Sequence, residues 1–177
     1  MHPLVILVVA MLLASLWGAA AFHKWRDLEG FRRALSAYRL VPAPLLAPVS
    51  VIFPVIETGL AVAVLYPASQ AVAGQVSACL LLLYALAMSV NLLRGNAAID
   101  CGCHFGRRRT IGWPLVVRNL ALAFVPLLPL MSSPAYAVQF QDILFAFLVA
   151  AFVLLALAIV AQLLSNQALQ TSAAKQE

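Results

Sequence analysis

Two cysteines separated by a single glycine form the feature of this sequence best suited to chemistry. Cys101 and Cys103 flank Gly102 in a short polar segment. The α-carbons of residues i and i+2 can come within the roughly 4.4–6.8 Å that a disulfide tolerates, and glycine permits the backbone dihedrals that ring closure needs. Because the ring is small, we expect its disulfide to be strained and easily reduced. The spacing therefore favours a redox-active thiol pair.

The residues around the two cysteines bear on their reactivity. Cations near a thiol stabilise its thiolate, which makes the cysteine a better nucleophile and leaving group. His104 and three arginines follow the pair and would have this effect, whereas the carboxylate of Asp100 would oppose it. The three arginines are Arg107, Arg108 and Arg109.

Two other interpretations of the pair stay open on the sequence alone. In the first, the cysteines are structural residues of a glycine-rich turn. In the second they bind a metal, but Cys101, Cys103 and His104 supply only three ligands, and a closed zinc site normally takes four. We therefore predict no metal site. A third cysteine, Cys79, lies inside an apolar stretch well before the pair, and we expect it to be a small buried hydrophobic residue without a partner.

The rest of the chain determines where the cysteine pair lies. Of the 177 residues, 64% are hydrophobic and 10% are charged, against about 45–50% and about a quarter in soluble domains. Crossing a hydrocarbon core of about 30 Å takes about 20 mostly apolar residues. Five stretches qualify, namely 3–22, 45–66, 71–93, 113–131 and 142–164. We predict a single all-α, polytopic membrane helix bundle over residues 1–166 and a disordered tail at 167–177.

The positive charges predict how the bundle is oriented. Nine of the eleven Lys and Arg residues fall in the segments 23–41 and 94–112, and five spans place both segments on one side of the membrane. Because Lys and Arg are enriched in cytoplasmic loops, we expect this side to be inside a bacterial inner membrane and the N-terminus outside. Anionic lipid explains the positive charge more simply than nucleic acid does. The first stretch has no Lys or Arg before its long apolar run, so we expect a retained helix rather than a cleaved signal peptide.

The first basic segment also has a helical period. Its apolar residues recur every three or four positions, with arginines mostly between them; they are Trp25, Leu28, Phe31, Leu35 and Tyr38. This pattern predicts an amphipathic helix near 25–38 that lies in the membrane interface. The helix either anchors the first hairpin of spans or offers a docking face to a partner.

Two ionisable residues fall clearly within predicted spans. A charge at the centre of a membrane helix costs about 2.5–3.5 kcal/mol on insertion scales. We therefore expect Glu57 in the second span and Arg118 in the fourth to face the bundle interior. Asn91 and Asn119 would complete a polar cluster with them. This cluster is either a salt bridge that locks two helices or a functional site. As a functional site it would bind a proton or a quinone cofactor.

Two stretches of the sequence resemble a known family. One runs from Phe31 to Pro42 and continues to Glu57, and the other runs from Asn91 through Cys101-Gly102-Cys103 to Asn119. In these stretches the chain resembles the methylamine utilisation protein MauE family, within a larger group of DoxX-like membrane proteins. The layout of apolar stretches is similar over nearly the full length, and the Cys-Gly-Cys context is the most specific part of the likeness.

The resemblance implies a role in the maturation of methylamine dehydrogenase, whose small subunit is periplasmic and rich in disulfides. It also implies a thioredoxin-like periplasmic partner, MauD, that forms or isomerises those disulfides, and assigns Cys101 and Cys103 to electron exchange with this partner. The implied partner is outside, whereas the charge rule puts the cysteine segment inside. The alternative is a non-catalytic membrane scaffold or export helper that docks a soluble partner and has structural cysteines.

Overall fold

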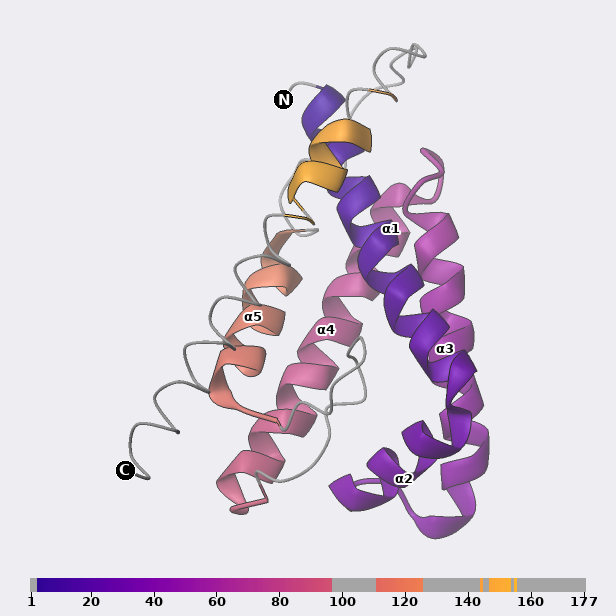
Figure 1. The fold of residues 1–177 in the computed structure, drawn as a ribbon, viewed down its shortest axis with the longest axis vertical. Coiled ribbons are helices and arrows are strands. Elements are labelled where there is room, and N and C mark those ends of the chain that lie inside the picture. The colour runs from indigo at the N-terminus through magenta and orange to yellow at the C-terminus, as the bar shows by residue number, and fades with distance from the viewer. Residues whose placement is uncertain (1–2, 97–110, 126–143, 145–146, 154, 156–177) are drawn as a thin grey trace, which may run out of the picture.

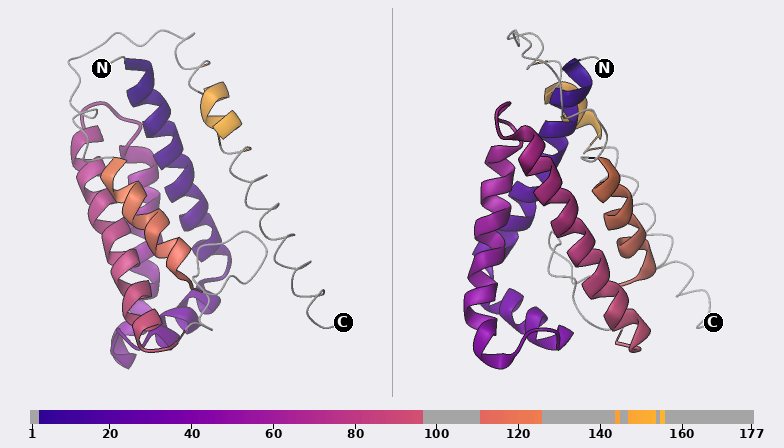
Figure 2. Two further views of the ribbon diagram at one scale, coloured as in Figure 1. Left: turned by 90° about the vertical axis from the view of Figure 1, so that its left-hand side faces the viewer. Right: turned by 180° about the vertical axis from the view of Figure 1, so that it is seen from behind.

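A computed structural model of the chain describes residues 3–96, 111–125, 144, 147–153 and 155. In this part of the chain the regular secondary structure is helical. Its elements are α1 (Pro3–Arg26), α2 (Leu28–Tyr38), a 3-10 turn η1 (Ala43–Leu45), α3 (Leu46–Ala63), α4 (Gln70–Leu93) and α5 (Trp113–Phe124), with a further helical segment at 147–153. The long helices run side by side and α2 lies across one end of them (Figures 1 and 2).

Three helical segments are long and apolar enough to cross a membrane: Val5–Arg26, Ala43–Ala63 and Gln70–Leu93. With a rise of about 1.5 Å per residue, 20 or more residues reach across the hydrocarbon core. The prediction of an all-α membrane helix bundle is therefore confirmed. The predicted stretches 113–131 and 142–164 are described only in part, and the tail at 167–177 lies outside the described residues. The count of five spans therefore stays a prediction.

Side chains from four helices meet in one hydrophobic core. They are Leu13 and Trp17 of α1, Leu60 and Val64 of α3, Ala73, Leu80 and Leu81 of α4, and Ala123 of α5. Large apolar side chains also cover the outside of the same helices, among them Val62, Leu86 and Phe124. An apolar outer surface of this extent suits lipid as the surrounding solvent.

The amphipathic helix of the first basic segment is α2, and it begins later than the sequence pattern suggests. Trp25 belongs to the last turn of α1, and the two helices are separated at Asp27. The side chain of Asp27 accepts a hydrogen bond from the backbone N–H of Gly30 over 2.8 Å and so caps α2. An aspartate cap satisfies one of the unpaired N–H groups at a helix start, which explains why the break falls here. On α2 only Phe31 is buried.

Candidate functional site

The predicted redox segment from Asp100 to Arg109, with Cys101, Gly102, Cys103 and His104, lies outside the described residues. The helix ends on either side of it are described. α4 ends at Leu93 and α5 begins at Trp113, and both of these ends lie at the end of the bundle that carries α2 (Figure 1). The readiness of the cysteine pair to form a disulfide therefore stays a prediction.

The described part of the chain contains a buried ion pair between Lys24 of α1 and Glu57 of α3. Nζ of Lys24 donates to Oε1 of Glu57 over 2.5 Å, and the two side chains are 1% and 0% exposed. Glu57 lies eleven residues beyond the first residue of α3, Leu46, which is about 16 Å along the helix axis. This distance is about half the thickness of a hydrocarbon core. Measured along α1, by contrast, Lys24 is only two residues from the helix end at Arg26, so the burial of the pair comes from the packing around it.

Three aromatic rings surround the ion pair, and we call them the aromatic cage: Phe31 of α2, Phe53 of α3 and Tyr84 of α4. Phe53 stacks on Tyr84 with ring centres 5.7 Å apart, and Phe31 meets Phe53 edge to face at 6.2 Å. Nζ of Lys24 lies 5.1 Å from the centre of the Phe31 ring and 5.3 Å from that of Tyr84. At these distances an ammonium group is attracted to a ring face, so the cage stabilises the charge of Lys24.

The two oxygens of Glu57 have different surroundings. Oε1 accepts from Lys24 and also from the hydroxyl of Tyr84, whose Oη lies 2.6 Å away. Oε2 is equally buried and accepts no hydrogen bond from any residue that the structure describes. Buried polar atoms nearly always have a partner, so the open acceptor on Oε2 is an unusual feature of the site.

Lys24 reaches the interior because it continues the buried stripe of α1. Ala10, Leu13, Trp17 and Ala21 follow each other at intervals of three or four residues and are buried, and Lys24 is the next step. Residues at this spacing share one face of a helix. Sequence reasoning assigned Lys24 to the basic loop and so missed it. The sequence did contain one indication: Lys24 follows Trp17 by seven residues, or two helical turns, and so lies on the same face of the helix.

Glu57 faces the interior as expected, but the partner expected for it was wrong. It binds Lys24, whereas Arg118 is exposed on α5 and donates from Nη2 to Oδ1 of Asn119 over 3.3 Å. The reason is geometric, because α1 packs along α3 and α5 packs along α4. A charge on α1 is therefore nearer to Glu57 than a charge on α5.

The two asparagines are buried but do not join Glu57. Nδ2 of Asn91 donates to the backbone carbonyl of Ala87, one turn earlier on α4, over 3.1 Å. Asn119 is the acceptor for the guanidinium described above and is 5% exposed. The predicted cluster therefore divides into an ion pair between α1 and α3 and separate polar side chains on α4 and α5.

Cys79 is exposed on α4 with a free thiol, although its neighbours Ala78 and Leu80 are buried. Its assignment as a buried hydrophobic residue was therefore wrong. In a helix that is apolar on all sides, the sequence does not distinguish the face that packs from the face that meets lipid.

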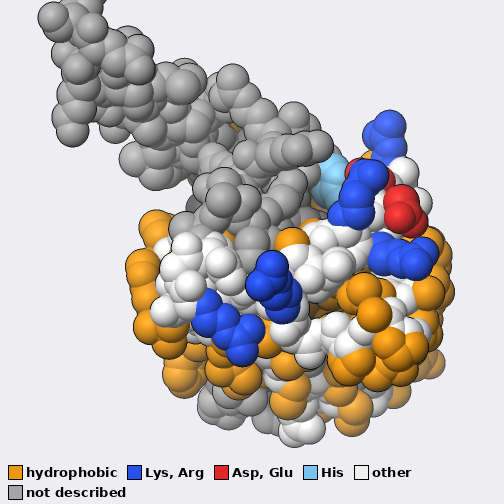
Figure 3. Space-filling model, turned by 90° about the horizontal axis from the view of Figure 1, so that it is seen from below, with side chains coloured by type: hydrophobic (Ala, Val, Ile, Leu, Met, Phe, Trp, Pro, Cys, Tyr) orange, Lys and Arg blue, Asp and Glu red, His pale blue; other side chains and the backbone are white. Residues whose placement is uncertain are grey.

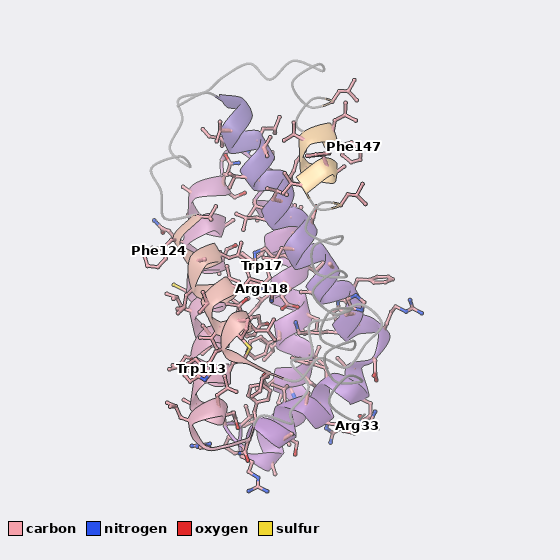
Figure 4. All side chains as sticks on the ribbon, turned by 60° about the vertical axis from the view of Figure 1, so that its left-hand side comes forward. Trp17, Arg33, Trp113, Arg118, Phe124 and Phe147 are labelled. Atoms are coloured by element: carbon pink, nitrogen blue, oxygen red, sulfur yellow. The ribbon has the colours of Figure 1, made fainter. Side chains whose placement is uncertain are left out.

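A second buried hydrogen bond connects α1 with α4. Nε1 of Trp17 donates to Oγ of Ser77 over 2.9 Å, and the Trp17 ring lies against Tyr84 with centres 6.5 Å apart. Figure 4 shows Trp17 within the bundle, and shows Trp113 and Phe124 on the outer side of α5, where both are exposed. The Trp17 contact positions the tyrosine that binds Glu57.

The end of the bundle that carries α2 is positively charged (Figure 3). Exposed basic side chains there come from both basic segments; they are Arg26, Arg32, Arg33, Arg39 and Arg94. The turn between α3 and α4, at the opposite end, has no charged residue. The described parts of the two basic segments thus share one end of the bundle, as predicted, while the side of the membrane that this end faces stays a prediction.

These features define a polytopic α-helical membrane protein with a basic amphipathic helix at one end and an ion pair in its interior. The sequence profile of the family described as methylamine utilisation protein MauE matches residues 2–132. The chain therefore belongs to this family, which confirms the resemblance seen in the sequence.

Relatives in three bacteria show how far the similarity extends. The chain is 35% identical over 135 residues to methylamine utilization protein MauE of Paracoccus denitrificans, covering 76% of this chain and 73% of the relative. It is 38% identical over 125 residues to the protein of the same name from Methylophilus methylotrophus, covering 68% and 65%. For the Methylorubrum extorquens protein the identity is 34% over 123 residues, covering 69% and 66%. No solved structure shows a significant match.

Proposed function

We propose that this chain serves methylamine utilisation as a membrane thiol–disulfide redox component. In this proposal it supports maturation of the methylamine dehydrogenase small subunit together with a thioredoxin-like, MauD-like partner. The observation that carries the proposal is the Cys101-Gly102-Cys103 sequence in a chain of the MauE family. The helix ends that flank this segment lie at the basic end of the bundle, where nearby cations would favour thiolates.

Thiol–disulfide exchange between the cysteine pair and the partner would take two steps. The thiolate of one cysteine, Cys101 or Cys103, attacks a disulfide of the partner, which forms a mixed disulfide and releases one partner thiolate. The second cysteine then attacks its neighbour's sulfur, closes the Cys101–Cys103 disulfide and releases the other partner thiolate. Two electrons pass to the partner, and the two protons lost by the cysteines are taken up by its thiolates. The reverse sequence oxidises the partner.

The exchange requires the cysteine segment and the partner to lie on one side of the membrane. The excess of Lys and Arg predicts that the segment lies inside, whereas the partners implied by the family are periplasmic. A membrane-impermeant maleimide applied to intact cells decides the matter. With the pair first reduced, labelling of Cys101 and Cys103 would place them outside and permit direct exchange. Labelling only after the membrane is permeabilised would rule out direct exchange with a periplasmic partner.

Single serine variants test the redox role. We expect Cys101→Ser and Cys103→Ser to abolish maturation of the dehydrogenase in a deletion strain while the membrane protein remains inserted, because serine neither forms nor resolves a mixed disulfide. One variant should accumulate the mixed disulfide with the partner and the other should not. Cys79→Ser is the matched control, since Cys79 lies within α4, fourteen residues before the end of that helix at Leu93, and should be dispensable.

The second candidate is a non-catalytic scaffold that docks a soluble partner. It is favoured by α2, whose Arg32 and Arg33 are exposed and whose buried contact is limited to Phe31. Full activity of the Cys101 and Cys103 variants, combined with loss of activity on replacing Arg32 and Arg33 by glutamine, would support the scaffold and exclude the redox role.

A further inference from the structure

The open acceptor on Glu57 identifies a second site, independent of the cysteines. Both donors that reach the carboxylate, Nζ of Lys24 and the hydroxyl of Tyr84, converge on Oε1. Oε2 lies in the bundle interior with no described donor. A pair that served only to hold two helices would be better satisfied if its two donors were divided between the two oxygens, since each carboxylate oxygen accepts more than one hydrogen bond.

We propose that Oε2 of Glu57 is a proton-binding site within the membrane bundle. In one state Glu57 is a carboxylate paired with the ammonium of Lys24. In the other, a proton from water is bound to Oε2, Glu57 is a neutral carboxylic acid, and Oε1 has become its carbonyl oxygen. Oε1 accepts from Lys24 and Tyr84 in both states, so the proton is gained or lost without breaking either hydrogen bond.

The aromatic cage allows the protonated state to persist. Protonation of Glu57 removes the counter-ion of Lys24, and an unpaired ammonium in a water-poor interior is strongly disfavoured. Here Nζ also lies 5.1 Å and 5.3 Å from the ring centres of Phe31 and Tyr84. Attraction to these two ring faces is larger when the cation is desolvated. The charge of Lys24 therefore keeps two partners that do not depend on the charge of Glu57.

Within the described residues, few charged or titratable groups lie around Glu57. In the described chain, α1 contributes Lys24, α4 contributes the Tyr84 hydroxyl, and α2 contributes the uncharged ring of Phe31. His23 precedes Lys24 on α1, and its ring meets the exposed Phe22 at 6.0 Å. The carboxyl of Glu57 has an open position for a proton at Oε2.

Infrared difference spectroscopy of the full-length protein in lipid nanodiscs tests the proposal, because a protonated carboxyl has a C=O stretching band that a carboxylate lacks. On acidification we expect the wild-type protein to gain such a band that is missing in Glu57→Gln. Glu29→Gln is the matched control. Glu29 is 68% exposed at the surface of α2, so this variant should keep the band.

Tyr84→Phe provides a second measurement that does not depend on the folding of Glu57→Gln. Loss of the hydroxyl that donates to Oε1 should shift the band of the protonated Glu57 to a different frequency while leaving it present. Identical carboxyl spectra in the wild-type, Tyr84→Phe and Glu57→Gln proteins, at every pH at which they remain helical, would overturn the proposal. Glu57 would then be a permanent carboxylate and the pair a structural lock.

Discussion

Replacing Lys24 with methionine should leave the Glu57 carboxylate buried without a counter-ion. The side chains of the pair are 1% and 0% exposed, so solvent screening does not reduce the effect. Breaking a buried ion pair by removing one partner costs about 3–5 kcal/mol. In the unfolded state the separated helices remain in an apolar environment, where Glu57 also costs about 2.5–3.5 kcal/mol on insertion scales. This cost in the unfolded state offsets part of the cost in the folded state. We therefore expect the lower end of the range, a loss of about 3 kcal/mol in the free energy of unfolding.

The measurement is reversible unfolding of the purified protein in mixed micelles with increasing SDS, followed by loss of near-ultraviolet circular dichroism, which reports the packing of aromatic side chains. The double variant Lys24→Met, Glu57→Leu should recover most of the loss, since an apolar replacement of both partners leaves no unpaired charge. Arg32→Met is the matched control, because Arg32 is half exposed and 3.7 Å from Glu29. It should change the free energy of unfolding by no more than about 0.5 kcal/mol.

Two results would refute this reasoning. A loss below about 1 kcal/mol in Lys24→Met would mean that Glu57 is not a desolvated charge in the native protein. A double variant as unstable as the single one would mean that the lysine matters through its packing and not through its charge.

Three further predictions concern other contacts. Asp27→Ala removes the cap of α2 and should lower the free energy of unfolding by about 1 kcal/mol, measured in the same micelles. Trp17→Phe loses the buried hydrogen bond to Ser77 and should cost about 1–3 kcal/mol because the hydroxyl is left unsatisfied; adding Ser77→Ala should restore part of it. Cys79 is exposed on α4, so Cys79→Leu should change the free energy of unfolding by no more than about 0.5 kcal/mol, and a loss of about 2 kcal/mol or more would contradict its position.

The helical architecture follows from features visible in the sequence. Long apolar stretches require helices because lipid offers no hydrogen-bond partner to the backbone, and α4 was predicted at 71–93 and spans Gln70–Leu93. The boundary between α1 and α2 was placed too early, because the hydrophobic period that predicted the second helix already begins at Trp25. The break lies at Asp27, which caps α2 through its side chain.

The interior polar site was only half visible in the sequence. Glu57 stands out because a carboxylate in an apolar stretch must find a partner. The identity of that partner depends on which helices are neighbours, and sequence periodicity in helices that are apolar all round carries little of this information. Lys24 resembled a residue of the interfacial loop, while Tyr84 is an ordinary residue of an apolar span. Only the packing of α1, α3 and α4 brings the three together.

The depth of the ion pair also explains the position of α2. Because Lys24 lies in the last turn of α1 and must reach Glu57, about 16 Å into α3, α1 ends well short of the first residue of α3. The chain that follows covers this gap as α2, which buries only Phe31. That ring touches both Phe53 and the ammonium of Lys24. A partner that docks on the exposed arginines of α2 and shifts this helix would therefore act on the buried charges through Phe31.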